Sequence, residues 1–418
     1  MVTKMKNNKN LEEEKIERKK LWEVTVWNKK FAGVEKHKQP KINSCHHYFS
    51  KDLKKLVSEK GEIKILTTNF SNVFADEEEV KTNISEGEII CIPGGGNPIV
   101  QYYNGKFITG DNKIATSYDK NKLNNKYLYY YLTHNIKLIS EMYRGGTIKH
   151  PDMAKILEIQ IPLPPLKKQA EIVAVLDKFT ELTEELTEEL TAREAQYEYY
   201  RNMLLIDQWN DEKIKAKNAE VIQTTVGDII ERYSEKAKND KNVTEVYSIS
   251  SEFGLIPSID YWKRKGSKNK KSYKMFSDDI SNYNIVRKNM FAYNQGYLNI
   301  GSIDCLLNEE AVLVSPLYKI FKIKKNIILP KYLLYFLKTS IVINKIDLMK
   351  ESGARNRFDF EKWKKIEISI PAIEIQKKII EFLDNFETLV NDIRQGLPRE
   401  IELRQKQYEY YREKLLSF

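Results

Sequence analysis

One short run of the sequence combines side chains that proteins use to bind a polyanion. Residues 261–271 hold two aromatic side chains, a Gly-Ser pair and six cations. Lysine and arginine neutralise phosphates and release counterions, and base readout requires Arg, Asn or Gln side chains that reach the groove edges. The run therefore predicts contact with nucleic acid, and a solvated basic loop is the alternative. Its candidate contact residues are Tyr261, Trp262, Lys263, Arg264, Lys265, Lys268, Lys270 and Lys271.

Three shorter segments also offer cations beside aromatic, glycine or asparagine residues. Segments 102–106 and 144–149 are predicted loops of the first half of the chain. Segment 355–357 occupies, in the second half, the place that 144–149 occupies in the first. The residues expected to contact nucleic acid are Tyr102, Tyr103, Lys106, Arg144, Lys149, Arg355 and Arg357.

No motif for catalysis or cofactor binding accompanies these segments. The sequence has no Asn/Asp-Pro-Pro-Tyr tetrapeptide of a methyltransferase and no GxxxxGK[ST] phosphate loop. The triple glycine 94–96 is framed by Pro93 and Pro98, which predicts a turn, with a phosphate cradle as the alternative. His46 and His47 are adjacent, and adjacent residues of a strand point to opposite faces, so we expect a structural role for them. We therefore predict neither a catalytic residue nor a metal site.

The framework that positions these candidates is duplicated. The sequence Gln-Tyr-Glu-Tyr-Tyr-Arg at residues 196–201 returns unchanged at residues 407–412. Upstream, an Ile-Pro pair matches at positions 161 and 370, and Lys-Tyr-Leu matches at positions 126 and 331. Partner residues lie about 205 to 211 positions apart, well beyond the repeat length of a solenoid. The sequence therefore predicts a tandem duplication of one globular domain followed by one long helix.

Each half ends in a predicted long helix. Residues 167–205 contain no glycine or proline, and apolar residues recur at spacings of three, four or seven. This stripe predicts a coiled-coil-like helix of about 40 residues, about 60 Å long. A second helix is predicted over 375–416, with a kink or break at 396–398, and an antiparallel pairing of the two is the simplest arrangement. The expected helix-pair or partner interface consists of Leu176, Phe179, Leu186, Leu190, Tyr197, Tyr200, Leu204, Leu383, Phe386, Tyr408, Tyr411 and Leu415.

Short β-type runs separated by Gly, Asn and Pro turns fill the rest of each half. In the first half, one amphipathic helix is expected over 126–138 and a last strand over 159–162. In the second half, a similar block covers 221–365 and ends in a strand over 366–370. The Lys- and Glu-rich residues 11–20 are expected to form a surface helix that packs on a partner.

A smaller repeat lies inside the first helix. Residues 181–192 are three tandem copies of a four-residue word, Glu-Leu-Thr-Glu or Glu-Leu-Thr-Ala. An ordinary Glu-rich exposed helix accounts for the composition, but near-perfect words also suggest a spacer that gains or loses units. One word adds about 6 Å of helix and a rotation of about 40° beyond a full turn. In B-DNA, about 6 Å corresponds to roughly one to two base pairs.

Composition narrows the class of protein. The 418 residues suffice for two domains, and 69 Lys and Arg against 59 Asp and Glu give a net charge of +10, which favours a polyanionic partner. Cys45, Cys91 and Cys305 form no CxxC pair, so neither a disulfide framework nor a zinc ribbon is expected. The N-terminus has no apolar signal region, and no apolar run approaches the roughly 20 residues of a membrane span. We predict a cytoplasmic protein that does not enter a membrane.

Taken together, these motifs resemble the specificity subunit of bacterial type I restriction-modification systems, usually called HsdS. The resemblance covers nearly the whole chain. It rests on the Ile-Pro-Leu-Pro-Pro-Leu segment 161–166, on Gln169 and Ile172, on the Leu-Asp pair 176–177 and on the two Gln-Tyr-Glu-Tyr-Tyr-Arg endings. The second copy is about two residues shorter here and lacks the double proline.

The resemblance implies an α+β fold with an internal pseudo-two-fold repeat. Two α/β target-recognition domains, 1–158 and 207–366, would be separated by two long antiparallel helices in conserved regions 159–206 and 367–418. Each domain would read one half of a split, asymmetric DNA target, and the helices would set the spacing. The implied partners are double-stranded DNA, two methyltransferase subunits that carry S-adenosylmethionine, and a restriction subunit. The chain itself would hold no cofactor and no active site.

Two other classes of protein remain open from the sequence. One is a nuclease or methyltransferase fused to a recognition domain, which the missing cofactor motifs oppose. The other is a coiled-coil scaffold without a role in DNA binding, which the charge and the α/β blocks oppose. An orphan subunit, or one that serves a single-polypeptide restriction enzyme, would have the same sequence features.

Overall fold

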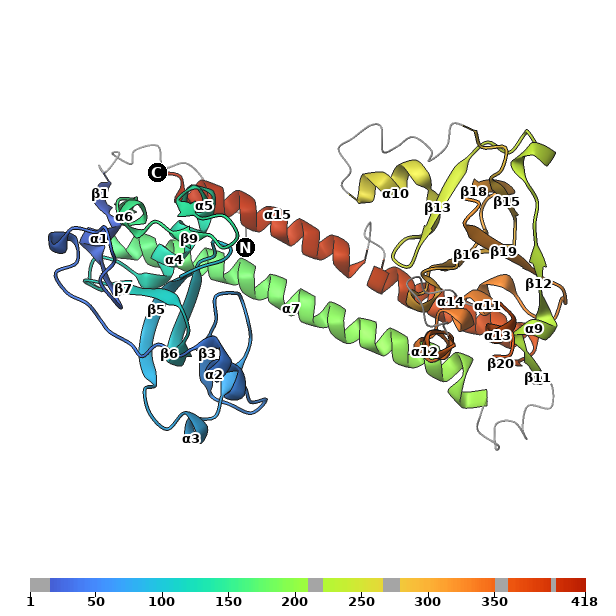
Figure 1. Cartoon of the computed structure of the whole chain (residues 1–418), viewed down its shortest axis with the longest axis horizontal. Helices are drawn as coiled ribbons and strands as arrows, with labels where there is room; N and C mark the ends of the chain where they lie inside the picture. Colours follow the sequence, from blue (N-terminus) through green and yellow to red (C-terminus); the bar gives the residue numbers. More distant parts are fainter. Residues whose placement is uncertain (1–15, 210–220, 266–278, 350–359, 392–395) are drawn as a thin grey trace, which may run out of the picture. The chain divides into compact units, whose positions relative to one another are not determined.

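The computed structural model describes residues 16–209, 221–265, 279–349, 360–391 and 396–418. The chain divides into two compact units (Figure 1). The first unit combines Met1–Glu185 with Ile401–Phe418, and the second is Leu186–Glu400. Each unit therefore contains one globular block, the start of the helical region that follows it, and the end of the helical region from the other half.

A six-stranded sheet forms the centre of the first unit. Its strands lie in the order β2-β7-β5-β6-β3-β4, and all neighbours are antiparallel except β3 and β6. The strand bounds are β2 Thr25–Trp27, β3 Ile63–Leu66, β4 Phe74–Ala75, β5 Ser85–Pro93, β6 Gln101–Thr109 and β7 Asn112–Ser117. A short hairpin, β8 Tyr143–Arg144 with β9 His150–Pro151, lies outside this sheet.

Helices of the first unit pack on this sheet in two hydrophobic clusters, with α2 and α3 in the smaller one. Their bounds are α1 Leu21–Val24, α2 Ser50–Lys55, α3 Glu77–Val80, α4 Asn125–His134, α5 Ile136–Glu141 and α6 Met153–Ile156. Helix α4 begins where the Asn124 side chain accepts hydrogen bonds from the amides of Lys126 and Tyr127. Its buried face packs with the sheet and with the start of the long helix at Leu176, which is 0% exposed. Leu416, from the other end of the chain, is buried in the same core.

The second unit contains two four-stranded sheets, ordered β12-β19-β16-β17 and β14-β13-β18-β15. The strand bounds are β12 Ile230–Tyr233, β13 Val246–Ser250, β14 Gly254–Pro257, β15 Asn284–Arg287, β16 Phe291–Asn294, β17 Ile303–Cys305, β18 Ala311–Val314 and β19 Tyr318–Ile323. The helix bounds are α9 Val226–Ile229, α10 Ser258–Arg264, α11 Pro330–Leu337, α12 Ser340–Leu348 and α13 Phe360–Trp363. Proline at the first position of α11 fits a helix start, where no amide donor is needed.

One pair of short strands occurs in both units. Strand β1 (Glu17–Lys20) pairs antiparallel with β10 (Gln160–Leu163), and β11 (Ile222–Thr225) pairs antiparallel with β20 (Glu367–Ile370). The predicted last strands are thus confirmed in both halves. The helix predicted over 11–20 is wrong for Glu17–Lys20, because these residues pair with a strand far along the chain. Residues 11–15 of the predicted helix lie outside the described residues.

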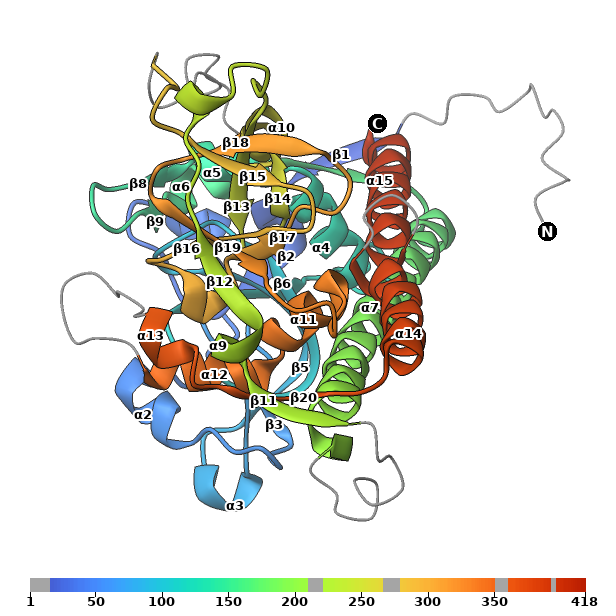
Figure 2. The same cartoon turned by 90° about the vertical axis from the view of Figure 1, so that its right-hand side faces the viewer.

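The two long helical regions differ. Helix α7 runs unbroken from Leu166 to Leu205, 40 residues, as its sequence predicts. The second region contains α14 (Ile373–Asn391) and α15 (Leu397–Leu416), and Gly396 between them is a bend. The interruption predicted at 396–398 is confirmed at Gly396. In the second unit α14 lies beside the last turns of α7 (Figures 1 and 2), and Tyr197 and Tyr200 of α7 contact Phe386 and Phe382 of α14. None of the described helices is both long enough and apolar enough to cross a membrane.

The duplication extends to buried hydrogen bonds. In the first unit Gln169 accepts from the amide of Asn124 at 2.9 Å and donates to the carbonyls of Lys122 and Pro164, each at 2.8 Å. In the second, Gln376 accepts from the amide of Leu329 at 2.8 Å and donates to two carbonyls in the same way. Both glutamines are 0% exposed. Each joins the start of its long helix to the segment before α4 or α11.

A second polar contact is also duplicated. In the first unit the Asp177 carboxylate accepts from the Tyr130 hydroxyl at 2.5 Å and pairs with Lys126 at 2.8 Å. In the second unit Asp384 accepts from Tyr335 and pairs with Lys331 at 2.7 Å. Burial raises the pKa of both tyrosines, so both hydroxyls stay protonated and donate. The same tyrosine, carboxylate and lysine therefore fix the long helix to the globular block in each unit.

Candidate nucleic-acid interface

The basic run of the second unit starts on a helix, not in a loop. Tyr261, Lys263 and Arg264 lie on α10, and Lys265 follows it. The run's other three lysines, Lys268, Lys270 and Lys271, lie outside the described residues. Ser258–Arg264 forms two turns of helix after Pro257, so the alternative of a solvated basic loop does not hold for residues 261–264.

Aromatic and acidic neighbours hold the described cations in place. Arg264 lies over the ring of Phe253 at 5.1 Å, and Tyr261 contacts the edges of the Phe253 and Trp262 rings. Lys265 pairs with Glu252 at 2.6 Å, and Lys263 pairs with Asp260 at 3.1 Å. These side chains are about half exposed, and exposed ion pairs contribute little, so the cations remain available to a phosphate.

Segment 102–106 is part of β6, so the prediction of a loop is wrong for this segment. Tyr102 points into the core beside α4: its hydroxyl donates to Glu88 at 2.9 Å and Lys126 lies over its ring. Burial raises the pKa of Tyr102, and the bond to Glu88 raises it further. Tyr103 is half-buried and contacts Phe107 edge-on. Lys106 is accessible but bonds Glu77 at 2.8 Å.

Segment 144–149 is the exposed tip of the β8–β9 hairpin. Arg144 is 64% exposed and pairs with Asp152 at 3.2 Å, and Lys149 is exposed. The two equivalent candidates of the second half, Arg355 and Arg357, lie outside the described residues. Among the first-unit candidates, Arg144 and Lys149 are thus the two that the structure places together on an exposed hairpin.

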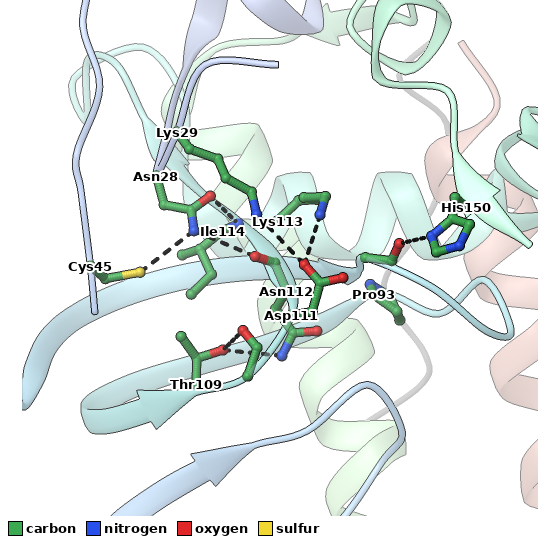
Figure 3. A network of polar contacts seen from close by, with 12 residues as sticks. Asn28, Lys29, Cys45, Pro93, Thr109, Asp111, Asn112, Lys113, Ile114 and His150 are labelled. Atoms are coloured by element: carbon green, nitrogen blue, oxygen red, sulfur yellow. Dashed lines mark hydrogen bonds and ion pairs between the residues drawn. The ribbon is translucent and has the colours of Figure 1, made fainter. Parts of the chain in front are cut away.

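The triple glycine is a close contact between two turns. A Cβ atom on Gly94 would lie 2.3 Å from the Asp111 carboxylate, and one on Gly95 would lie 3.0 Å from the His150 ring. The Gly94 amide donates to the Asp111 carbonyl at 2.6 Å, and the Gly94 carbonyl lies 2.7 Å from His150 Nδ1 (Figure 3). The amide and the carbonyl of Gly94 therefore both contact other groups of the protein. The glycines allow the β5–β6 connection to fit between the β6–β7 turn and the β8–β9 hairpin.

Sequence reasoning missed a basic cluster beside this contact. Lys113 and Lys29 both approach Asp111 Oδ1, at 2.9 and 3.6 Å. Burial lowers the pKa of Lys113, the bond and charge of Asp111 oppose that change, and the charge of Lys29 lowers it further. The Gly-Asp-Asn sequence at residues 110–112, just before Lys113, is typical of a turn between two strands. Nothing local in the sequence connects Lys29 with it.

The predicted interface residues lie along the long helices. Leu176, Tyr197 and Leu383 are buried, and Tyr411 is 39% exposed. The half-buried members are Phe179, Leu186, Leu190, Tyr200, Leu204, Phe386, Tyr408 and Leu415. In the first unit Phe179 stacks on Tyr411 with ring centres 5.1 Å apart.

The repeated tyrosine-arginine pair has the same geometry in each unit. Arg201 lies 5.2 Å from the ring centre of Tyr197, and Arg412 lies 5.2 Å from that of Tyr408. Tyr197 packs on the globular block of the second unit, and Tyr408 packs on that of the first unit. Their side chains are therefore part of the folded units.

Cys45, His46 and His47 lie on the segment after β2. The Cys45 thiol accepts from the Asn28 side chain at 3.5 Å, and the ring of His46 contacts Tyr48 edge-on. Within the described residues, no group of three or more His, Cys, Asp or Glu side chains is arranged to hold a metal ion.

Comparisons with known proteins agree with one another. A family model described as the type I restriction modification DNA specificity domain matches residues 44–193 and 218–403. A putative type I restriction enzyme specificity subunit of Haemophilus influenzae is 33% identical over 367 residues, which cover 82% of this chain and 86% of that protein. The EcoR124I/EcoR124II specificity subunit of Escherichia coli is 35% identical, over 73% of this chain and 74% of that protein.

The solved structures show the same fold. The type I restriction-modification S subunit of M. genitalium superposes with a TM-score of 0.57 at 13% sequence identity. The match covers 99% of this chain and 98% of that chain. This chain and the M. genitalium subunit therefore share the repeated two-domain fold. At 13% sequence identity, the superposition shows a similar fold and nothing more.

Proposed function

Because the chain belongs to the type I restriction-modification DNA specificity family, we propose that it is the subunit that selects the DNA target of such a complex. One observation carries the proposal: the same buried glutamine and the same tyrosine-carboxylate-lysine contact recur in two units whose sheets differ. A constant framework that holds two different globular blocks suits the recognition of two different half-sites.

The proposed division of labour leaves the chemistry to other subunits. Each unit reads one half of a split, asymmetric duplex target. Two methyltransferase subunits, which bind S-adenosylmethionine, modify adenine, and a restriction subunit cleaves unmodified DNA. This chain contributes recognition and spacing.

Co-expression with the methyltransferase subunit of the same genome, followed by methylome sequencing, tests the proposal. We expect methyl-adenine at one motif, made of two defined half-sites that flank a fixed gap of unspecified bases. Unmodified DNA in spite of a stable complex would contradict the role in modification and indicate an orphan subunit. Failure to form any complex would favour the scaffold class instead.

The long helices offer a surface for the methyltransferase subunits. In the second unit a shallow groove between α7 and α14, about 410 Å³, is lined almost entirely by apolar atoms. Phe382, 44% exposed, lies in this groove beside Tyr200, Met203 and Ile379. In the first unit Val175 is equivalent to Phe382, and Tyr411 is equivalent to Tyr200. These two side chains are 38% and 39% exposed. A like surface present twice suits two copies of one partner.

Phe382→Glu is the sharpest test of this docking surface. We expect at least tenfold weaker association with the methyltransferase subunit, because a carboxylate would be desolvated in an apolar contact. Association is measured with purified subunits by calorimetry or by size-exclusion chromatography. The matched control is Leu317→Glu, which places the same charge at an apolar side chain that is 76% exposed elsewhere in the second unit. Equal affinity of the two variants would place docking on another surface.

A further inference from the structure

The fully buried Asn112 fixes the turn that carries the Asp111 cluster. Asn112 is 0% exposed, and its amide group donates to the Leu66 carbonyl at 2.9 Å and the Thr67 carbonyl at 3.2 Å. It also lies 3.2 Å from the Thr109 hydroxyl (Figure 3). A buried amide with several partners resists displacement, because each lost bond would leave a buried polar group unsatisfied. The backbone around Asp111 is therefore rigidly held.

Asn28 positions the second lysine. Its backbone amide donates to the Ile114 carbonyl at 2.8 Å, and its side-chain oxygen accepts from the Ile114 amide at 3.0 Å. These two bonds extend the β2–β7 pairing one residue beyond Trp27, where strand β2 ends. Lys29, the next residue, is thereby placed beside the start of β7 and next to Lys113 (Figure 3).

The resulting cluster has more positive than negative charge. The ammonium groups of Lys113 and Lys29 share one oxygen of Asp111. Burial alone would raise the pKa of Asp111, but the bond from Lys113 and the nearby positive charges lower it, so the carboxylate is ionised. Two ammonium groups held around one carboxylate repel each other. A second anion at this place would relieve that repulsion.

The cluster continues into the exposed β8–β9 hairpin. Asp111 contacts Gly94 through its backbone carbonyl, and Gly94 contacts His150 at the base of the hairpin. The hairpin adds the exposed cations Arg144 and Lys149. Hydrogen bonds and ion pairs therefore link Lys29 from the segment after β2, Lys113 from β7 and the hairpin that carries Arg144 and Lys149. Lys29 and the hairpin cations are the exposed members, and the Lys113 side chain is 14% exposed.

We infer that Lys29 and Lys113, gathered on Asp111, form a clamp for a backbone phosphate of duplex DNA in the first unit. Asp111 is the positioning residue: it orders two long side chains before DNA arrives, so less side-chain entropy is lost on binding. The inference rests on the proposed DNA-recognition function and names a contact of that same site. Phosphate contacts position a protein on the duplex and carry no sequence information of their own.

Lys29→Gln is the main test, because Lys29 is 43% exposed and its loss should not disturb the core. The wild-type and variant chains, each in complex with the methyltransferase subunits, are titrated with a labelled mixed-sequence duplex between about 50 and 200 mM salt. We expect the slope of log affinity against log salt to fall by about 0.9, and affinity near 0.1 M salt to fall about five- to tenfold. Lys113→Gln should give a similar change, with its melting temperature measured in parallel.

Lys55→Gln is the matched control. It removes the same charge from the first unit at a side chain that is 75% exposed and paired with Asp52 at the end of α2. If Lys29→Gln and Lys55→Gln have the same slope as the wild type, the clamp is excluded while DNA binding stands. If the wild-type complex shows no salt-dependent DNA binding, the proposed function itself fails, and the two failures are thus distinguishable.

Asp111→Asn separates positioning from charge. The substitution keeps the shape of the side chain but removes its negative charge. A purely electrostatic role predicts tighter binding to every duplex. The positioning role predicts weaker binding to every duplex, because the two lysine side chains are no longer ordered before DNA arrives. Tighter binding would show that Asp111 does not position the clamp.

Discussion

Deleting one four-residue word, residues 185–188, is expected to shorten the preferred gap between the two half-sites by about one to two base pairs. Helix α7 stays helical after the deletion, because the neighbouring word has the same sequence. It loses about 6 Å in length and is rotated by about 40° beyond a full turn. Methylome sequencing of cells that express the variant should show both half-site sequences unchanged and the original motif unmodified.

The burial pattern of α7 supports this expectation. Between Leu176 and Tyr197, both buried, α7 has no fully buried residue, and its described leucines at 182, 186 and 190 are half-buried. The boundary between the compact units also falls within the words, between Glu185 and Leu186. Changing the length of this segment therefore removes little of either core.

The control keeps the length and changes the charge. Glu185→Gln combined with Glu188→Gln should leave the gap as it is, because both side chains are exposed and the helix keeps its rise. A change in half-site bases at a fixed gap would refute the spacer role. Loss of methylation at every gap would show that the second helical region, which has no such words, does not accommodate the shorter α7.

The sequence predicted those parts of the fold that depend on local patterns. Helix α7 follows from a long segment without glycine or proline, and the bend at Gly396 follows from a glycine one residue before the start of α15. The strands β10 and β20 were predictable because the duplication places the same Ile-Pro motif in both halves. A motif that occurs at matching positions in both halves is stronger evidence for a strand than a motif that occurs once.

Pairing between distant segments was not predictable in the same way. Glu17–Lys20 has the charged composition of an exposed helix, yet β10 supplies its hydrogen-bond partners. Tyr102 is expected at a surface only if segment 102–106 is a loop, and its place in β6 turns the ring inward. The Asn28–Asn112 bond joins residues 84 positions apart, so no local pattern predicts the cluster that it helps to build.

Gln376→Leu should strongly destabilise the second unit. The side chain is 0% exposed and satisfies the Leu329 amide and two backbone carbonyls. Leucine has a similar volume but no polar atom, so it would leave one buried and two partly buried backbone groups without this partner, at roughly 1–3 kcal/mol for each group that water does not reach. We expect the free energy of unfolding of the second unit to fall by about 3 kcal/mol or more. Urea unfolding followed by tryptophan fluorescence, which reports on the buried Trp363 in this unit, measures the change.

The duplication supplies the controls for this substitution. Gln169→Leu should destabilise the first unit by a similar amount, since Gln169 makes the same three hydrogen bonds there. Gln196→Leu, at an exposed position of α7, should change stability by no more than about 0.5 kcal/mol. If the Gln376 variant were as stable as the Gln196 variant, the glutamine would not be the joint between block and helix. If Gln376→Leu and Gln169→Leu both destabilise, the constant framework depends on the same buried amide in each half, which explains how two different globular blocks share one helical support.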